Sequence, residues 1–115
     1  MSRYVLTVDL KDDPAAVAAY REHHRRVWPE VVESLRRAGI LTMDIYLLER
    51  RAVMVVETTG SSPERCFAAH AASGPRVAEW EALMKSLQQA PPGGDPAWSW
   101  TRMDLVFSLR GSAVP

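Results

Sequence analysis

Four segments of this chain have the side-chain pattern of β-strands, and their order constrains the fold more than any other feature. Along a strand, successive side chains point to opposite faces, so apolar residues at every second position predict one buried face. Residues 3–10, RYVLTVDL, show this alternation, with Tyr4, Leu6 and Val8 on one face. The other three segments are residues 40–48, 52–58 and 100–109.

The segment between the first and second predicted strands has the sequence features of a helix. Asp13 before Pro14 predicts a helix start, because aspartate caps free backbone N–H groups and proline suits the first helical position. Apolar residues then recur every three or four positions up to about Ala38, and Gly39 predicts the helix end. Pro29 lacks a backbone N–H, so the helix should kink or restart there.

A second helical region begins at residues 61–64, SSPE, and is interrupted at Gly74 and Pro75. The resulting order, β-α-β-β-α-β, predicts a ferredoxin-like α+β fold in a single domain over residues 1–115. Two helices on one face of a four-stranded sheet leave the other face uncovered, and a partly apolar face is rarely left open to water. We therefore expect a homodimer packed through this open sheet face. Its predicted apolar residues are Val5, Tyr46, Val53, Val55 and Val106.

The amino-acid composition argues against several classes of function. The 14 Lys and Arg residues balance 14 Asp and Glu residues, which argues against a nucleic-acid partner. The one cysteine, Cys66, cannot form an internal disulfide, as is usual in a reducing cytoplasm. No apolar run approaches the ~20 residues that span a bilayer, and the first residues lack the apolar core of a secretion signal. We expect a soluble cytoplasmic protein without a membrane partner.

The segment YREHHRRVWPE, residues 20–30, is the strongest functional signal. Tyr20, His24 and Trp28 are four residues apart, so a helix places a phenol, an imidazole and an indole on one stripe. Histidine titrates near neutral pH and can donate and accept protons, so His24 is the candidate catalytic acid. The alternative is a hydrogen-bonded core histidine without a catalytic role. Three amphipathic side chains on one stripe favour the functional interpretation.

Other residues point to a site less specifically. Trp80 could stack on the C–H face of a sugar, although a lone tryptophan at helical spacing usually packs in a core. Glu81 becomes a candidate only if it turns toward the pocket that contains His24. His70 is expected at the surface. The histidines form no metal-ligand spacing with Cys66 or nearby acids, so neither a metal nor another cofactor is predicted.

The motif in residues 20–30, Tyr-x3-His-x3-Trp-Pro-Glu, resembles the signature of the L-rhamnose mutarotase family. The resemblance covers residues 3–109, and residues 10–13 and 88–89 look closer to a branch of that family associated with L-fucose. It implies a dimeric α+β barrel and a cofactor-free epimerase that acts at the anomeric carbon of a monosaccharide.

The resemblance also implies roles for single residues. It implies His24 as the proton donor, Tyr20 as a sugar-binding residue, and Trp80 as the first of two adjacent aromatic residues in the pocket. This chain departs from the family at the second aromatic position, where it has Glu81, and it has Met43 where rhamnose enzymes resemble one another in having a tyrosine. Both L-rhamnose and L-fucose stay candidate substrates. The C6 methyl group of such a sugar could contact Trp28, Met43 or Trp80.

Two other functions fit the same features. A cofactor-free monooxygenase of the dimeric α+β barrel type would also place tryptophan and histidine near an aromatic substrate. A non-catalytic module would bind a small ligand through Trp28 and Trp80 without accelerating a reaction. The proton-transfer partner of His24 stays open between Tyr20, Glu81 and a bound water. Tyr20 is better suited to orient a hydroxyl group, because the pKa of a free phenol is ~10.

Overall fold

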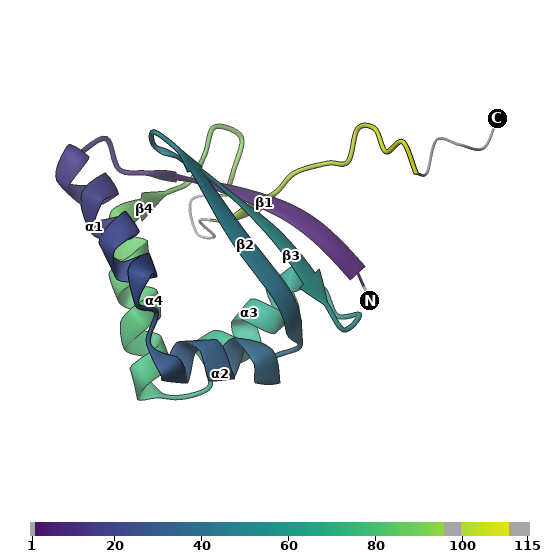
Figure 1. Cartoon of the computed structure of the whole chain (residues 1–115), viewed down its shortest axis with the longest axis horizontal. Coiled ribbons are helices and arrows are strands. Elements are labelled where there is room, and N and C mark those ends of the chain that lie inside the picture. Colours follow the sequence, from purple (N-terminus) through teal and green to yellow (C-terminus); the bar gives the residue numbers. More distant parts are fainter. Residues whose placement is uncertain (1, 96–99, 111–115) are drawn as a thin grey trace.

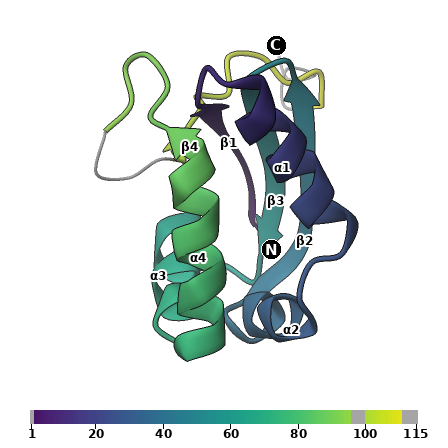
Figure 2. The same ribbon diagram turned by 90° about the vertical axis from the view of Figure 1, so that its left-hand side faces the viewer.

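The computed structural model describes residues 2–95 and 100–110 of the chain. In this part of the chain, the helices lie on one face of an antiparallel sheet (Figure 1, Figure 2). None of these helices has the length and hydrophobicity of a transmembrane span. The elements, in chain order, are β1 (Ser2–Leu10), α1 (Pro14–Arg25), α2 (Pro29–Arg37), β2 (Ile40–Leu48), β3 (Arg51–Thr58), α3 (Pro63–Ala71), α4 (Pro75–Leu87), β4 (Gln88–Gln89) and β5 (Thr101–Arg102).

The sheet has the strand order β2-β3-β1-β4, and β5 also pairs with β1. β1 pairs with β3 along nearly its whole length, and β2 pairs with the other edge of β3. The two short strands share the free edge of β1, where β4 pairs at Asp9 and Leu10 and β5 pairs at Leu6 and Thr7. The strands predicted over residues 3–10, 40–48 and 52–58 are confirmed as β1, β2 and β3.

The sheet face that meets the helices forms the core. Leu6, Val8 and Leu10 of β1 are completely buried, as the alternation in this strand predicts. Helix side chains pack on this face in two clusters. One cluster surrounds Cys66 of α3, and the other joins Tyr20 of α1 to α2, α4 and β1. Because α1 and α4 also contact each other, they form a wall opposite the sheet (Figure 1).

The helical region after β1 restarts at Pro29, one of the two outcomes that this proline predicts. α1 ends at Arg25 and α2 begins at Pro29. Trp28 has φ −59° and ψ 135°, which is an extended conformation, because a following proline ring disfavours helical backbone in the residue before it. α2 therefore runs across the end of α1 instead of continuing it, and it closes one end of the space between helices and sheet (Figure 1).

The prediction of a strand over residues 100–109 is wrong for most of its length. β5 contains only Thr101 and Arg102, and residues 103–108 are outside the sheet, where they extend away from the body of the molecule (Figure 1). Alternation alone does not make a strand, because a strand also needs a neighbour that supplies backbone hydrogen bonds. The apolar side chains Leu105, Val106 and Phe107 are therefore 81%, 95% and 67% exposed.

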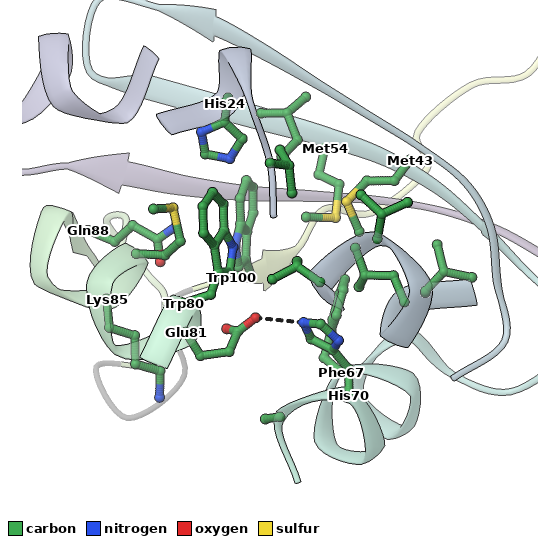
Figure 3. A pocket seen from close by; sticks show the side chains of 18 of the residues that line it. His24, Met43, Met54, Phe67, His70, Trp80, Glu81, Lys85, Gln88 and Trp100 are labelled. Atoms are coloured by element: carbon green, nitrogen blue, oxygen red, sulfur yellow. Dashed lines mark hydrogen bonds and ion pairs between the residues drawn. The ribbon is translucent and has the colours of Figure 1, made fainter. Parts of the chain in front are cut away.

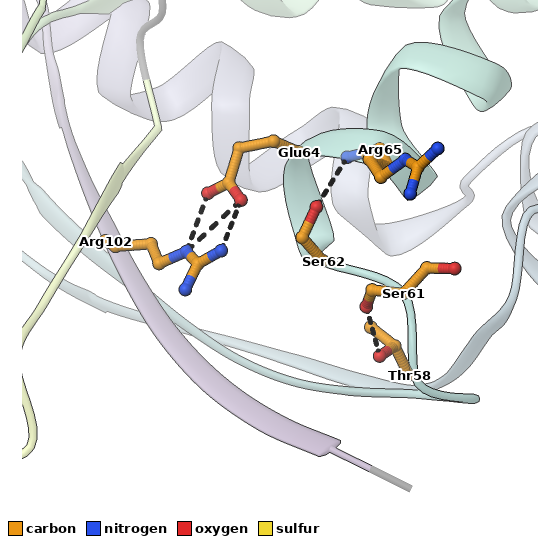
Figure 4. A network of polar contacts seen from close by, with 6 residues as sticks. All are labelled: Thr58, Ser61, Ser62, Glu64, Arg65 and Arg102. Atoms are coloured by element: carbon orange, nitrogen blue, oxygen red, sulfur yellow. Dashed lines mark hydrogen bonds and ion pairs between the residues drawn. The ribbon is translucent and has the colours of Figure 1, made fainter.

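Arg102 ties the start of this terminal segment to α3 (Figure 4). Its Nη2 donates to Oε1 of Glu64 at 2.7 Å, and its Nε donates to Oε2 at 2.9 Å. These charge-assisted hydrogen bonds hold the pKa of the Glu64 carboxyl below its usual range. The same helix turn is capped by Ser62, whose Oγ accepts a hydrogen bond from the N–H of Arg65. The N-terminus of α3 is thus fixed against the sheet.

Candidate active site

A cavity of about 760 Å³ lies between the helices and the core face of the sheet, and Figure 3 shows many of the side chains that line it. Its volume lies in the range of small-molecule sites. Side chains from α1, α2, β2, β3, α3 and α4 contribute, so the cavity depends on the folded domain as a whole. Its ionisable lining residues are Tyr20, His24, Arg36, His70, Glu81 and Lys85.

His24 projects from the last turn of α1 into this cavity (Figure 3). Its Nδ1 is 2.7 Å from the carbonyl oxygen of Tyr20, which can only accept, so Nδ1 carries a proton and donates it. Burial lowers the pKa of His24 below its ordinary value of 6.5, although the hydrogen bond to Tyr20 opposes this effect and the nearby His23 adds to it. At neutral pH the imidazole is therefore mostly neutral, with the lone pair on Nε2.

Tyr20 lies one helical turn before His24, and the two ring centroids are 4.3 Å apart. Its side chain is almost completely buried. Burial raises the pKa of Tyr20 to about 12; a hydrogen bond with Gln88 works against this, and the negative charge of Glu81 adds to it. The phenol stays protonated at neutral pH, so it can donate a hydrogen bond and does not serve as the resting base.

The indole of Trp80 on α4 lies next to His24, and a second indole, that of Trp28, packs against Trp80. The Trp80 ring meets the His24 ring edge to face, with 5.7 Å between centroids, and it lines the cavity. Trp28 packs against Trp80 at 5.1 Å, and the guanidinium of Arg76 lies 3.5 Å from the centre of a Trp28 ring. Trp28 is not part of the cavity lining, and its contact with the substrate stays a prediction. The break before Pro29 turns Trp28 out of the stripe that it would share with His24 on a continuous helix.

Glu81 follows Trp80 on α4 and lines the same cavity as His24. Its Oε1 lies 3.0 Å from Nε2 of His70 (Figure 3). The expectation that His70 is at the surface is wrong, because its side chain is only 1% exposed. The sequence does contain a signal for this burial, since Pro63, Cys66 and His70 are spaced by three and four residues and form the buried stripe of α3.

The predicted site residues come together, apart from Trp28. Tyr20 and His24 reach the cavity from α1, Met43 from β2, and Trp80 and Glu81 from α4. Sequence reasoning missed the buried Gln88, which lines the cavity from β4 and bonds to the Tyr20 phenol. The sequence marks Gln88 only through the likeness of residues 88–89 to the L-fucose branch, and no periodicity assigns it a role, because it lies after the end of α4 and is positioned by pairing with β1.

Metal binding has no support from clustered ligands in the described part of the chain. Within residues 2–95 and 100–110, no group of three or more His, Cys, Asp or Glu side chains is arranged to hold a metal ion. The acid–base groups of the cavity include two imidazoles, a phenol and a carboxyl group, which are able to transfer protons.

The antiparallel sheet with helices on one face and a cavity between the two layers defines a ferredoxin-like α+β protein with a small-molecule site, and the predicted fold class is confirmed. The sequence model described as L-rhamnose mutarotase matches residues 3–109, and the chain therefore belongs to the L-rhamnose mutarotase family. This confirms the resemblance of the motif in residues 20–30. Mutarotases of this kind are isomerases that interconvert sugar anomers.

Individual proteins agree with this assignment. An L-fucose mutarotase from Xanthomonas campestris is 40% identical over 111 residues, which cover 95% of this chain and 89% of that protein. The crystal structure of an L-rhamnose mutarotase from Formosa agariphila superposes with a TM-score of 0.67 and 21% identity, covering 95% of this chain and 99% of the other. An antibiotic biosynthesis monooxygenase has the same fold, with a TM-score of 0.54, 19% identity and coverage of 91% and 99%.

Proposed function

We propose that this protein is a mutarotase that interconverts the α and β anomers of a 6-deoxyhexose, with L-fucose as the first candidate and L-rhamnose as the second. The observation that carries the proposal is the His24 ring, whose Nδ1 proton is committed to the backbone while the ring lines an aromatic cavity. Family membership supports the reaction type, and the 40% identity to an L-fucose mutarotase favours L-fucose.

Interconversion of anomers requires two proton transfers. The ring oxygen gains a proton, the anomeric hydroxyl loses one, and the pyranose opens to an aldehyde. The C1–C2 bond then rotates, and the ring closes on the other face of the carbonyl group. One group acts as acid and another as base, and their roles exchange on closure. His24 is the proposed proton donor, in the imidazolium form that it reaches when its free Nε2 takes a proton from water. General acid–base catalysis supplies roughly 10²–10⁴-fold, enough for a reaction that already proceeds in water.

The other lining groups fit the substrate. The protonated phenol of Tyr20 can donate to a sugar hydroxyl, and the indole of Trp80 can stack on the C–H-rich face of the pyranose. A 6-deoxy sugar carries a methyl group at C6, and the half-buried Met43 offers an apolar contact for it. Because no residue at these positions needs a bound ion for these contacts, we propose catalysis without a cofactor.

We also propose that the protein acts as a cytoplasmic homodimer formed through the open sheet face. Tyr46 and Leu48 project from β2 on this face and are 62% and 76% exposed. Val53 and Val55 of β3 lie on the same face and are half-buried, next to Val5 of β1. A second copy would cover these side chains and offer a surface for the exposed apolar segment, residues 103–109.

A monosaccharide exchange experiment tests the proposed function. Saturation-transfer NMR on a sugar at anomeric equilibrium measures how fast the α and β signals exchange, without a coupling enzyme. We expect the protein to accelerate exchange of L-fucose or L-rhamnose. L-Galactose is the matched control sugar for L-fucose, because it has a C6 hydroxyl in place of a hydrogen, and it should exchange more slowly. Unchanged exchange for all three sugars would contradict the proposal.

The two alternative functions predict different results in the same samples. A cofactor-free monooxygenase would consume oxygen in the presence of a quinol. A non-catalytic binding module would show quenching of tryptophan fluorescence by a sugar without faster anomer exchange. The likeness to the monooxygenase, at 19% identity, concerns the fold and adds no observation specific to oxygen chemistry.

A further inference from the structure

His70 and its partners form a polar network in the wall of the cavity, and the mechanism above assigns this network no role. His70 is at the end of α3, and its side chain is surrounded by protein. Its Nδ1 is 2.8 Å from Oγ of Ser34 on α2, and its Nε2 is 3.0 Å from Oε1 of Glu81 on α4. Ser34 Oγ is also 2.8 Å from Oγ of Ser73, which follows α3. Helices α2 and α4 therefore each supply one hydrogen-bond partner to an imidazole ring on α3.

Counting hydrogens fixes the direction of these bonds. Ser73 Oγ lies 2.7 Å from the backbone carbonyl of His70, which can only accept, so Ser73 gives its one hydroxyl hydrogen there. Ser34 must then donate to Ser73, and its Oγ is left as an acceptor for Nδ1 of His70. Nδ1 therefore carries a proton in the only assignment that completes all of these bonds. The remaining bond, Nε2 to Glu81 Oε1, contains a single proton shared by an imidazole and a carboxyl group.

The carboxyl group of Glu81 has one oxygen in this network and one outside it. Oε1 is held by the buried imidazole, while the side chain as a whole is 36% exposed and lines the cavity. Among the described residues, Oε2 makes no hydrogen bond or ion pair. Glu81 also supplies the only carboxyl group among the described lining residues. A proton acceptor with a fixed orientation thus faces the cavity that contains His24.

We propose that Glu81 is the catalytic base that works opposite His24, and that His70, held by Ser34, is the residue that positions its carboxylate. The assignment adds a catalytic base to the proposed mutarotase function and rests on that function. The other ionisable groups in the lining are less suited to this role. Tyr20 holds its proton to high pH, and the side chains of Arg36 and Lys85 are hydrogen-bond donors without an acceptor atom. The negative charge of Glu81 also helps to raise the pKa of the Tyr20 phenol, so the two groups interact electrostatically.

The proton transfers balance with these two groups. On ring opening, the O1–H bond breaks and its proton goes to Oε2 of Glu81, while the electron pair of that bond forms the C1=O1 double bond. The C1–O5 bond breaks, and O5 takes a proton from Nε2 of His24. Because Nδ1 donates to the backbone, Nε2 carries a proton only in the imidazolium form, so the reacting state is the fraction of molecules in which the neutral ring has first taken a proton from water. As Oε2 gains its proton, the shared proton resides on Nε2 of His70. Ring closure on the other carbonyl face reverses both transfers, so the enzyme returns to its starting state without a co-reactant.

The first test replaces the base. Glu81→Gln keeps the shape of the side chain and removes its basicity, so anomer exchange should fall by about 10²-fold or more. Glu79→Gln is the matched control, because Glu79 is on the same helix and its exposed carboxylate pairs with Arg76. Thermal unfolding of both variants should match the wild type closely enough to show an intact fold.

If the wild type is active, full activity of Glu81→Gln would overturn the assignment of Glu81 alone. Failure of the wild type to exchange any sugar would overturn the proposed function as well.

The second test separates positioning from a merely structural role. His70→Gln places an amide N–H near the position of Nε2 and can still donate to Glu81, whereas His70→Asn keeps only the contact with Ser34. We expect His70→Gln to retain most of kcat, and His70→Asn to lose about tenfold or more with little change in KM. The acid limb of the pH–rate profile should also move to higher pH in His70→Asn. Equal kcat values and pH profiles in the two variants would overturn the positioning role.

The third test does not depend on activity. Long-range ¹H–¹⁵N NMR of the imidazole rings distinguishes protonated from bare ring nitrogens. We expect Nδ1 of His70 to be protonated in the wild type, with a shared proton at Nε2, and we expect Glu81→Gln to convert Nε2 into a bare acceptor of the new amide. A bare Nδ1 in the wild type would contradict the hydrogen count and overturn the network, even if the protein is an active mutarotase.

Discussion

Tyr20 and His24 lie one helical turn apart, and the same burial changes their pKa values in opposite directions. It raises the pKa of the phenol and lowers that of the imidazole, because a medium of low polarity disfavours the charged form of each group. Both side chains are therefore neutral in the resting protein at pH 7. Each can take part in hydrogen bonds and proton transfer without a permanent charge in the cavity.

The Tyr20 phenol should stay protonated well above the usual range of tyrosine. Its pKa is raised from 10.0 to about 12, so it contributes stability that is complete below pH 10 and is lost as the pH rises toward 12. NMR of ¹³C-labelled tyrosine at pH 10.5 should show Tyr20 in its neutral form. Tyr20→Phe identifies the signal by removing it. Ionisation of this signal below pH 10 would mean that the phenol is not buried as described.

For single helices and strands, the local sequence pattern predicts which element a segment can form. Strand pairing and helix packing then decide whether that element is present in the fold. The stripe from Tyr20 to His24 could be found from the sequence, because residues four apart on one helix are neighbours whatever the rest of the fold does. The bond between His70 and Glu81 could not, because it depends on how α3 packs against α4. The strand predicted over residues 100–109 is reduced to two residues for the same reason, because alternation in its sequence does not show whether a partner strand is present.

The turn between α2 and β2 provides a test of backbone conformation at this scale. Gly39 has φ +101°, and a Cβ there would lie 3.0 Å from Oγ1 of Thr59. Gly39→Ala should therefore lower the free energy of unfolding by about 1–2 kcal/mol, measured by urea denaturation. Gly74→Ala is the control, because Gly74 is extended and has open space where a Cβ would lie. It should change stability by less than about 0.5 kcal/mol, and equal losses in both variants would contradict the role of the positive φ.

At the scale of the whole molecule, the exposed apolar surface is the feature that a single copy does not explain. The open sheet face and the segment of residues 103–109 together expose large side chains that soluble proteins usually cover. The β-α-β-β-α-β order predicts this uncovered face correctly, because both helical regions must pack on the same side of the sheet. The sequence could not show that the last segment leaves the sheet, since that depends on what else is present to pair with it.

Light scattering after size-exclusion chromatography tests the dimer. We expect a molar mass of twice the 12.8 kDa of one chain. Tyr46→Asp, on the open face, should shift the protein toward the monomer, because a buried unpaired carboxylate is costly. Ala18→Asp, on the exposed side of α1, is the control and should leave the mass unchanged. A monomeric wild type at micromolar concentration would contradict the proposed assembly.

The proposed function depends on His24 transferring a proton to a bound sugar. The most direct measurement is the α–β exchange rate of L-fucose by saturation-transfer NMR, with wild type, His24→Ala and His23→Ala compared at equal concentration. His23 is the matched control, because it is the adjacent histidine on α1 and is not part of the cavity lining. We predict fast exchange with the wild type and His23→Ala, and a loss of about 10²-fold or more with His24→Ala. Undiminished exchange with a folded His24→Ala protein would contradict the catalytic role of His24.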